Sequence, residues 1–349
     1  MSKATPTRSH MSFGVLGCAN IARQFIRDIR VSSDFKVAAV ASRDTEKARN
    51  FATENDVDRS YGSYEALLAD PQLEAIYLPL PNSMHAEWAV KAANAGKHIL
   101  CEKPMALNRR EAEQMFEAAH RNGVVLLESY PFWFQPQTGA LIDLVKGGSI
   151  GAVRSVMASF GFTVGNPQTN IRLKSDLGGG ALLDAGSYPL SLIRLVMGVA
   201  PARVSASAGM TDAGVDMNTM ALLEFSDGRR AQLSCAMDGA NHRHATIVGT
   251  DGTIYTEYLN HTSDQSSGNA FGYLPSRMSI RRGVAQTIPF EPLSSPTGSG
   301  FLFAAQAFAR LVRSHDAVAI SAASSASIDI AATLDAIRES ARTRRPVDL

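Results

Sequence analysis

Between residues 12 and 128, short apolar runs alternate with stretches of helical spacing, and this alternation constrains the fold more than any other feature of the sequence. The runs are unbroken rather than alternating, as expected of strands buried on both faces of a parallel sheet. They are SFGVLG (12–17), KVAAVAS (36–42), AIYLPL (75–80), HILCE (98–102) and VVLLES (124–129). Strand–helix alternation of this kind predicts a doubly wound α/β domain of the Rossmann type.

Two of the intervening helical stretches carry end signals. NSMHAEWAVKAANAGK offers Asn82 as a candidate N-cap and Gly96 as a stop. NRREAEQMFEAAHRNG starts at Asn108 and has Glu111 three residues later, which is the spacing of a capping box. Both patterns predict helices that connect successive buried strands.

After residue 130 the pattern changes to alternating apolar and polar residues, as in VRSVMASFGFTV and NTMALLEFSDGRRAQLSCAM. This alternation predicts strands with one buried face, and Asp227-Gly228 and Asp251-Gly252 predict hairpin turns. LLDAGSYPLSLIRLVMG and two stretches near the end of the chain have helical spacing instead. The sequence therefore predicts three parts: a disordered extension (1–11), a Rossmann domain (12–128), and an α+β domain with an open, mainly antiparallel sheet and helices on one face (129–349).

The composition is that of a globular protein, because 45% of the 349 residues are hydrophobic, 19% are charged and the formal net charge is +1. The near-neutral charge gives no reason to expect a nucleic acid, and we find no apolar run near the ~18 residues needed to cross a membrane. Three widely spaced cysteines argue against a disulfide framework and predict a cytoplasmic location. His242 and His244, two residues apart, lack metal-site spacing, so no metal is expected.

The first apolar run ends in Gly17-Cys18-Ala19-Asn20-Ile21-Ala22, at the position of the G-x-G-x-x-G/A dinucleotide fingerprint. Gly17 supplies the tight turn, while Ala19 replaces the glycine that lets the backbone approach a pyrophosphate most closely. The N-terminus of the next helix, at Asn20 and Ile21, offers free N–H groups for phosphate. A plain strand–helix turn would look much the same, but the place of this turn in the first βαβ unit favours a nucleotide site.

The end of the second run indicates which dinucleotide binds. NAD sites place an acidic residue there to hold the ribose 2′-hydroxyl, whereas this chain has Ser42 and Arg43. A hydroxyl and a guanidinium suit a 2′-phosphate, which favours NADP(H) over NAD(H). Asp44 would repel that phosphate, so we expect it to point outward and cap the next helix. The alternative is that Arg43 is a solvated loop residue.

Three tracts resemble the glucose–fructose oxidoreductase / inositol dehydrogenase (Gfo/Idh/MocA) family in residue type, order and spacing. They are GVLGCANIA (14–22), PNSMHAEWAVKAANAGKHILCEKPMA (81–106) and LGGGALLDAGSYPLSLIRLVMG (177–198). The resemblance covers residues 12–349, and the combination of Glu-Lys-Pro with GGG-x-x-x-D-x-G-x-Y is specific. SYPFWFQPQ and NIRLKSDLGGGALLD are most similar to the dihydrodiol dehydrogenase, aldose (xylose) dehydrogenase and sugar ketoreductase branch.

The resemblance implies an active site at Glu102-Lys103-Pro104, at the carboxyl edge of the parallel sheet. Lys103 would be the catalytic lysine, with its ammonium on the substrate oxygen. Glu102 would help to position Lys103 and the cofactor. Pro104 would fix the strand exit, and a cis bond is one way of doing so.

The third tract places Asp184 and Tyr188 on a helix that follows the glycines at 178–180. Four residues apart, the two side chains would share one helix face and act on one ligand. The pKa of a tyrosine is ordinarily ~10, and a neighbouring Lys103 ammonium would lower it, which makes Tyr188 the expected acid/base. Asp184 would bind a substrate hydroxyl or orient Lys103. The alternative for Tyr188 is a helix residue packed on the sheet.

The same resemblance implies that Pro79, Asn82 and His85, at the Pro-Asn-x-x-His tract, bind the cofactor, although His85 could equally be structural. Arg172 stands where relatives place an arginine close to the substrate. Trp133 belongs to an aromatic cluster that either walls the sugar pocket or belongs to the core.

One departure is Gln135, because relatives often have His before Pro-Gln, and this leaves the substrate open. Residues 259–300 are expected to be loop-rich and to line the substrate entrance.

These residues predict an NADP(H)-dependent oxidoreductase that transfers a hydride between nicotinamide and a sugar or related polyol, as an aldose 1-dehydrogenase does. One alternative is a sugar ketoreductase that acts on a nucleotide-linked or anhydro-sugar. Another is a non-catalytic NADP-sensing regulator, which would have been free to lose Lys103, Asp184 and Tyr188. The family forms dimers and tetramers through its open sheet, so a homodimer or homotetramer is expected.

Overall fold

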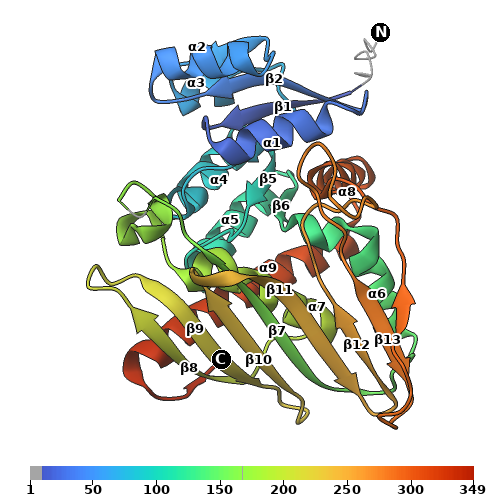
Figure 1. Cartoon of the computed structure of the whole chain (residues 1–349). Helices are drawn as coiled ribbons and strands as arrows, with labels where there is room; N and C mark the ends of the chain where they lie inside the picture. The colour runs from blue at the N-terminus through green and yellow to red at the C-terminus, as the bar shows by residue number, and fades with distance from the viewer. Residues whose placement is uncertain (1–9, 167) are drawn as a thin grey trace.

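A computed structural model describes residues 10–166 and 168–349. Most of the expected extension, residues 1–9, lies outside the described residues. Met11, the last residue of the expected extension, is instead the first residue of strand β1 (Met11–Leu16) and is buried, because its side chain joins the apolar core behind the strand. The described chain forms two sheets, shown one above the other in Figure 1.

The first sheet has six parallel strands in the order β3-β2-β1-β4-β5-β6, which confirms the predicted Rossmann arrangement. Its other strands are β2 (Phe35–Ala41), β3 (Arg59–Tyr61), β4 (Ala75–Leu78), β5 (His98–Glu102) and β6 (Leu126–Ser129). Its helical elements are α1 (Asn20–Ile29), α2 (Thr45–Glu54), α3 (Tyr64–Leu68), η1 (Asn82–Met84), α4 (His85–Asn94) and α5 (Arg109–Arg121). The sequence does not predict β3 and α3. A strand of three residues and a helix of five are too short to show a hydrophobic period.

The end signals are correct at two helices and wrong at a third. Asn108 caps α5 by accepting from the backbone N–H of Glu111, and Asp44 caps α2 by accepting from that of Lys47. Asn82 is not the cap of α4, which begins at His85. Its side chain instead donates to the carbonyl of Gly178 in the second domain, and this tertiary hydrogen bond replaces the predicted local one.

The second sheet has nine strands in the order β14-β13-β12-β11-β7-β10-β9-β8-β15, and all neighbouring strands are antiparallel except β7 and β10. The strands are β7 (Val153–Thr163), β8 (Arg203–Met210), β9 (Asp216–Glu224), β10 (Arg230–Ala236), β11 (Asp238–Gly249), β12 (Gly252–Thr256), β13 (Met278–Arg282), β14 (Glu291–Leu293) and β15 (Val347–Asp348). Two of them, β13 and β14, lie within the span expected to be loop-rich. The predicted hairpins join β9 to β10 and β11 to β12.

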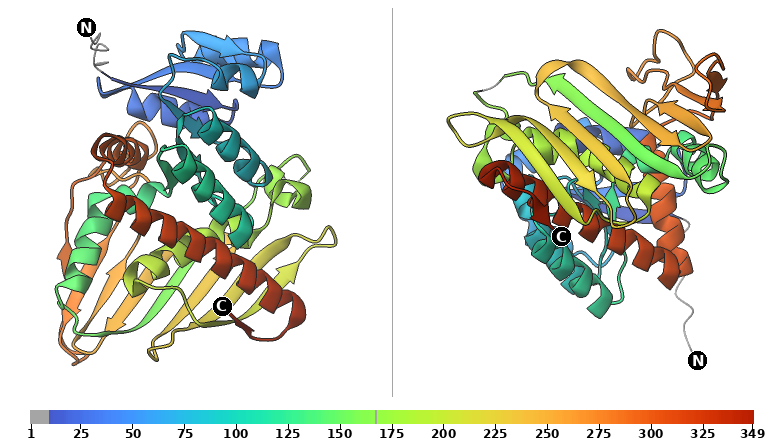
Figure 2. Two further views of the ribbon diagram at one scale, coloured as in Figure 1. Left: turned by 180° about the vertical axis from the view of Figure 1, so that it is seen from behind. Right: turned by 90° about the horizontal axis from the view of Figure 1, so that it is seen from below.

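Helices cover one face of this sheet, as Figure 2 shows. The helical elements are η2 (Pro131–Phe134), α6 (Pro136–Lys146), η3 (Ile171–Leu173), η4 (Ser175–Leu177), η5 (Leu182–Gly186), α7 (Ser187–Met197), α8 (Gly300–Ser314) and α9 (Ala317–Thr343). The helix α7 packs on β7 and β10, and α9 packs on β8. The helix α8 has a different neighbour, because Phe301 and Phe308 lie in the core of the first domain beside Phe13 and Phe25.

Among the described residues, α9 is the one helix long and apolar enough to span a membrane by length and composition, although no membrane span is expected from the sequence. Its most apolar window has a mean hydropathy of 1.5, and 33% of that window is buried. The helix packs against β8, α5 and α7, with Ile330, Leu334 and Ile337 buried. These are the contacts of a helix that covers a sheet.

Candidate active site

Lys103 and Asp184 meet where the two domains touch. Lys103 follows directly after β5, and its Nζ donates to the Asp184 carboxylate and to the Asp184 backbone carbonyl, both at 3.0 Å. The Lys103 side chain is 11% exposed and that of Asp184 17%. An ion pair this poorly solvated holds its geometry more firmly than a surface pair does. The pair therefore fixes an ammonium at the carboxyl edge of the parallel sheet.

Arg172 completes the charge arrangement from the rim. Its Nε donates to the second carboxylate oxygen of Asp184 at 2.6 Å, and its side chain is 44% exposed. Burial raises the pKa of Asp184, but Lys103 and Arg172 outweigh burial, so the net pKa lies below the usual value. Burial lowers the pKa of Lys103. Asp184, Tyr188 and Glu102 raise it by more than burial lowers it, so the net shift of the pKa is upward. Both charges are therefore stable at neutral pH.

Tyr188 lies beside the same ammonium. The Nζ of Lys103 is 4.6 Å from the centre of the Tyr188 ring, and the Tyr188 hydroxyl accepts a hydrogen bond of 3.0 Å from the Asn260 side chain. Asp184 lies in η5, a wide π-helical turn, and Tyr188 lies in the first turn of α7. Both side chains reach Lys103, so the structure brings all three predicted catalytic residues together.

Glu102 is buried next to Lys103 and binds groups of the first domain. Its carboxylate accepts from the Tyr77 hydroxyl at 2.7 Å and from the backbone N–H of Lys103 at 3.3 Å. Burial raises the pKa of Glu102 to about 7. The Lys103–Pro104 peptide bond is cis. Glu102 and Pro104 thus hold the backbone of Lys103 at the strand exit.

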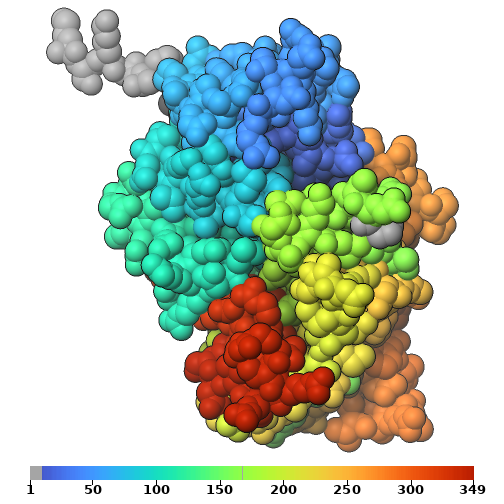
Figure 3. Space-filling model, turned by 90° about the vertical axis from the view of Figure 1, so that its left-hand side faces the viewer, coloured from blue at the N-terminus to red at the C-terminus, as the bar shows by residue number. Residues whose placement is uncertain are grey.

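His85 is fully buried, and each ring nitrogen faces a backbone carbonyl: Nδ1 lies 2.9 Å from that of Pro104 and Nε2 2.8 Å from that of Leu80. No ring nitrogen is left to face a ligand, so any effect of His85 on a cofactor passes through the position of Pro104. Asn82 ties the β4 exit to Gly178. Figure 3 shows the second-domain segment around that glycine (lime green) lying against the first domain.

The expected phosphate site has the geometry of a dinucleotide turn. Gly17 has φ +112°, and a Cβ there would lie 3.0 Å from Leu80 and 4.0 Å from the carbonyl of Pro79. The helix α1 begins at Asn20, and Ala19 in the N-cap position provides no side-chain acceptor for the first N–H groups. The N–H groups of Asn20 and Ile21 therefore lack a side-chain partner from the cap, as a phosphate-binding helix start requires.

The expected 2′-phosphate site also has compatible groups at the end of β2. Arg43 is exposed, close enough to Tyr64 to oppose the rise that burial causes in the pKa of that phenol. The Ser42 hydroxyl accepts from the backbone N–H of Asp44, which leaves its own hydrogen to donate. Asp44 itself points to α2. The residues at both sites thus fit a dinucleotide phosphate.

Trp133 belongs to an aromatic cluster, two members of which pack directly against Tyr188. Tyr130 and Phe132 are completely buried, with ring centres 5.6 Å and 6.1 Å from that of Tyr188, so they belong to the core. Trp133 is only partly buried, packs against Tyr130 at 4.8 Å, and has a solvent-inaccessible indole nitrogen without a hydrogen-bond partner in the described chain. The Tyr130 hydroxyl is likewise buried without a hydrogen-bond partner in the described chain, so two polar groups of this cluster are unpaired and closed to solvent.

Sequence reasoning does not single out two residues of this site, Asn260 and Arg243. Asn260 binds the Tyr188 hydroxyl, and Arg243 lies 4.2 Å from the centre of the Tyr188 ring. Arg243 stands between His242 and His244, which drew attention only to the question of a metal site, and Asn260 lies near the start of the span 259–300 expected to line the entrance. Within residues 10–166 and 168–349, no group of three His, Cys, Asp or Glu is placed to hold a metal ion.

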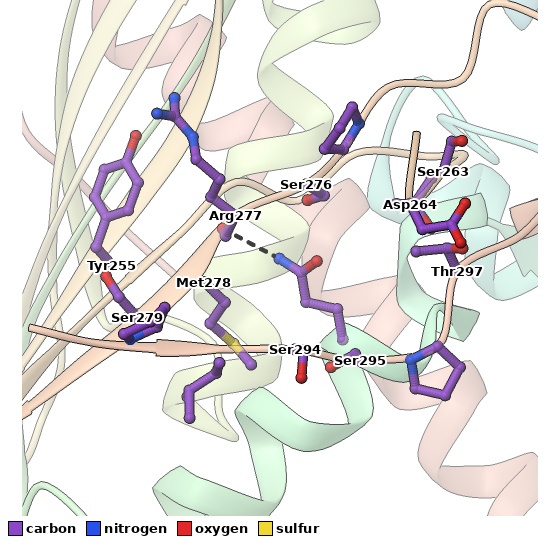
Figure 4. Close-up of a pocket in the computed structure, with 16 residues that line it drawn as sticks. Tyr255, Ser263, Asp264, Ser276, Arg277, Met278, Ser279, Ser294, Ser295 and Thr297 are labelled. Atoms are coloured by element: carbon purple, nitrogen blue, oxygen red, sulfur yellow. Dashed lines mark hydrogen bonds between the residues drawn. The ribbon is translucent and has the colours of Figure 1, made fainter. Parts of the chain in front are cut away.

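A pocket of about 520 Å³ lies apart from this site, at the β12–β14 edge of the second sheet (Figure 4). Serines 263, 276, 279, 294 and 295 line it, and Gln137 crosses it to donate to the carbonyl of Arg277. None of the predicted catalytic, cofactor-binding or substrate-binding residues lines this pocket.

An ammonium at a Rossmann strand end, facing an acid and a phenol from a second domain, is an arrangement suited to dinucleotide-dependent oxidoreductases. The comparisons with known proteins agree with this class. Residues 11–130 match the family model described as oxidoreductase family, NAD-binding Rossmann fold, and residues 139–255 match the GFO/IDH/MocA C-terminal domain. The chain belongs to the Gfo/Idh/MocA oxidoreductase family.

Among its relatives is a D-xylose 1-dehydrogenase (NADP(+)) of Haloferax volcanii, 35% identical over 97% of this chain and 100% of the relative. The 3-ketoreductase KijD10 of Actinomadura kijaniata, solved with NADP and TDP-benzene, is 32% identical, with a TM-score of 0.84 over 95% of this chain and 98% of its own. An aldose-aldose oxidoreductase of Caulobacter crescentus, solved with glycerol, is 26% identical, with a TM-score of 0.85 over 97% of this chain and 100% of its own.

Proposed function

We propose that this protein is an NADP(H)-dependent oxidoreductase that acts on the CH–OH group of a sugar or related polyol, in the manner of an aldose 1-dehydrogenase. The observation that carries the proposal is the Lys103 ammonium, held by Asp184 beside the Tyr188 ring at the end of β5. A relative that spans the whole chain and is named a D-xylose 1-dehydrogenase (NADP(+)) supports the substrate class.

The cofactor would be held by Gly17, Ala19, Asn20 and Ile21 at its pyrophosphate and by Ser42 and Arg43 at its 2′-phosphate. Pro79, Asn82 and Glu102 would contact the rest of the cofactor between that turn and Lys103. When bound, NADP(H) supplies the hydride acceptor or donor. The presence of a guanidinium where NAD sites have an acid favours NADP(H), as does the NADP in the name of the Haloferax relative.

Tyr188 and Lys103 would divide the work on the substrate oxygen. Asn260 donates to the Tyr188 oxygen, so the hydroxyl hydrogen of Tyr188 is free to be exchanged with a substrate hydroxyl. An ammonium has three N–H groups, and Asp184 accepts only two hydrogen bonds from Lys103, so the third can bind the same substrate oxygen. Negative charge that develops on this oxygen would meet a fixed positive charge.

Arg172 would provide a second positive charge beside the Asp184 carboxylate. It binds the Asp184 oxygen that Lys103 does not bind, and its exposed side chain lies at the rim, where a sugar hydroxyl can reach it. Trp133, which is only partly buried, would contribute its ring as an apolar wall for the sugar.

A second candidate function is the reduction of a keto group on a nucleotide-linked sugar. The similarity to KijD10, over nearly the full length of both chains, favours it. The same residues would then catalyse the reverse reaction, in which Tyr188 donates its proton to the carbonyl oxygen as the carbonyl carbon accepts the hydride.

The uncovered face of the second sheet supports a homodimer or homotetramer. Met157, Met220 and Leu222 are 43%, 67% and 39% exposed. Met157 and Leu222 both pair with Gln232 of β10, so they are two strands apart on the face opposite the helices. An apolar patch of this kind is typical of a surface that binds another subunit.

The test is turnover of a panel of aldoses and diols with NADP⁺, and of ketosugars with NADPH, followed by nicotinamide absorbance. Lys103→Met is expected to lower kcat by about 100-fold or more while NADP⁺ binding, measured by calorimetry, stays within about threefold. Tight NADP⁺ binding with no turnover of any of these substrates would overturn the proposal in favour of the non-catalytic alternative.

A further inference from the structure

Arg243 in β11 is surrounded by aromatic rings. Its guanidinium carbon lies 4.2 Å from the centre of the Tyr188 ring, 4.8 Å from those of Phe160 and Tyr258, and 5.4 Å from that of Phe132. The residue as a whole is partly exposed, but its Nε has no solvent contact and no hydrogen-bond partner. No carboxylate in the described part of the chain forms an ion pair with it.

Burying the Arg243 guanidinium at this position destabilises the folded protein. Removing a guanidinium from water without an acid partner costs free energy, and cation–π stacking on the aromatic faces offsets only part of that cost. Burial lowers the pKa of Arg243 from its usual value, and Tyr188 and Tyr258 oppose that shift. An apolar side chain would fill the same cage without the cost, so a role for the charge itself is the simpler explanation.

Arg243 also fixes the orientation of Asn260. Its Nη2 donates to Asn260 Oδ1 at 3.0 Å, and Asn260 Nδ2 lies 3.0 Å from the Tyr188 hydroxyl. A guanidinium can only donate, so the amide oxygen of Asn260 must face Arg243 and the amide NH₂ must face Tyr188. The Tyr188 oxygen is therefore the acceptor in this bond. Without Arg243, either end of the Asn260 amide could face Tyr188.

Gln135 holds this arrangement in place. Its Nε2 donates to the backbone carbonyls of Asn260 and Gly298 at 2.8 Å and 2.9 Å, and its Oε1 accepts from Thr262 at 3.2 Å. The glutamine that departs from the family pattern thus anchors the segment that presents Asn260 to Tyr188.

We propose that Arg243 and Asn260 are positioning residues that favour the phenolate form of Tyr188, Arg243 by its charge over the ring and Asn260 by its donated hydrogen bond. This inference rests on the proposed function, in which Tyr188 exchanges the substrate proton. A donor to the oxygen and a cation near the ring both stabilise the charged form of a phenol. Tyr188 thus has a second cation besides Lys103, from an element remote from β5.

Other groups act on Tyr188 as well and must be held constant in a test. The charged or titratable groups that interact with it are Lys103, Arg172 and Arg243, the phenols of Tyr77 and Tyr130, and Asp184 through Lys103. The test variants therefore change Arg243 or Asn260 and leave these other groups in place.

The variants are Arg243→Met, which removes the cation over the rings, and Asn260→Leu, which removes the donor to the Tyr188 oxygen, and each keeps the side chain close in size. Arg281→Met is the matched control, because Arg281 also lies over a ring (Phe290, at 4.4 Å) and also has a buried Nε without a partner, but it lies on β13. Two readouts are followed: kcat/KM of the oxidation against pH, and tyrosinate absorbance against pH as the difference between each protein and its Tyr188→Phe counterpart.

Arg243→Met and Asn260→Leu are each expected to move the limb of kcat/KM and the Tyr188 titration upward by about one pH unit, with the larger shift for Arg243→Met. At neutral pH, kcat should fall by about tenfold while KM changes little. Arg243→Lys, which restores a cation, should recover part of the shift, and Arg281→Met should titrate as the wild type does.

Unchanged titration of Tyr188 in both variants would overturn the inference and leave the proposed function standing. Full activity in Tyr188→Phe would overturn the proposed function, and the absorbance titration would still report on Arg243 and Asn260. If Arg243→Met fails to fold, Asn260→Leu and Arg243→Lys decide the question by the same two readouts.

Discussion

The side chain of Asn82 donates a 2.8 Å hydrogen bond to the carbonyl of Gly178, and this bond joins the exit of β4 to the loop that precedes Asp184. The two residues are also packed closely. Gly178 has φ +74°, and a Cβ there would lie 2.9 Å from Asn82 Cβ and 2.7 Å from the end of Leu107. Glycine at this position lets the second domain approach η1 and Leu107 of the first domain.

Gly178→Ala should destabilise the protein by about 2–3 kcal/mol, because the substitution adds a clash to the cost of a positive φ. Gly148 is the matched control, since it has the same φ of +74° with no atom within 4 Å of the added Cβ. Gly148→Ala should cost only about 1 kcal/mol. Urea unfolding measures both, and equal losses would show that the packing against Asn82 has no energetic weight.

Arg43→Ala should raise the KM for NADP⁺ by about tenfold or more and leave that for NAD⁺ nearly unchanged, because the guanidinium would contact only the 2′-phosphate. Arg49→Ala, which removes an exposed arginine of α2, is the control. Steady-state kinetics with both cofactors gives the answer. A parallel loss with NAD⁺ and NADP⁺ would mean that Arg43 serves the fold of the loop.

Glu128→Gln should stabilise the protein above neutral pH. Burial raises the pKa of Glu128 from 4.5 to about 7. Between these values the folded state holds a proton that the unfolded state has lost, so the contribution of Glu128 to stability falls as pH rises through that window. The variant should match the wild type near pH 5 and exceed it by up to about 3 kcal/mol near pH 8.

Urea unfolding at both pH values tests this, with Glu117→Gln, an exposed change on α5, as the control. Glu102 is present in all three proteins, so only the part of its titration that depends on the Glu128 charge differs between them. A Glu128→Gln protein whose advantage is the same at both pH values would contradict the expected titration.

Met220→Glu should weaken self-association, because a carboxylate would be buried in an apolar contact between sheets. We expect the dissociation constant of the oligomer to rise about tenfold or more, as measured by light scattering on a size-exclusion column. Val318→Glu, at an 81% exposed position of α9, is the control and should leave the mass unchanged. A wild-type protein that is monomeric at all concentrations would contradict the proposed assembly.

The strands of the first domain and the position of Lys103 could be predicted because they depend on local signals. A buried parallel strand is an unbroken apolar run, and Lys103 follows one such run directly. Arg243 and Asn260 give no such signal, because they are 55 and 72 residues from Tyr188 in the sequence and meet it only through the second sheet and its loops. Asn82 shows the same limit, since a distant carbonyl competes with the local cap that its sequence predicts.

The packing of α8 has a consequence for how the chain acquires its structure. Phe301 and Phe308 fill the space beside Phe13 and Phe25, although the ribosome adds them long after β6 has emerged. Until then, the half that holds the nucleotide site exposes an aromatic surface to the cell. The core of the first domain is therefore complete only after α8, near the end of the chain, has been synthesised. A fragment that ends after β6 would expose this aromatic surface and would be prone to aggregate.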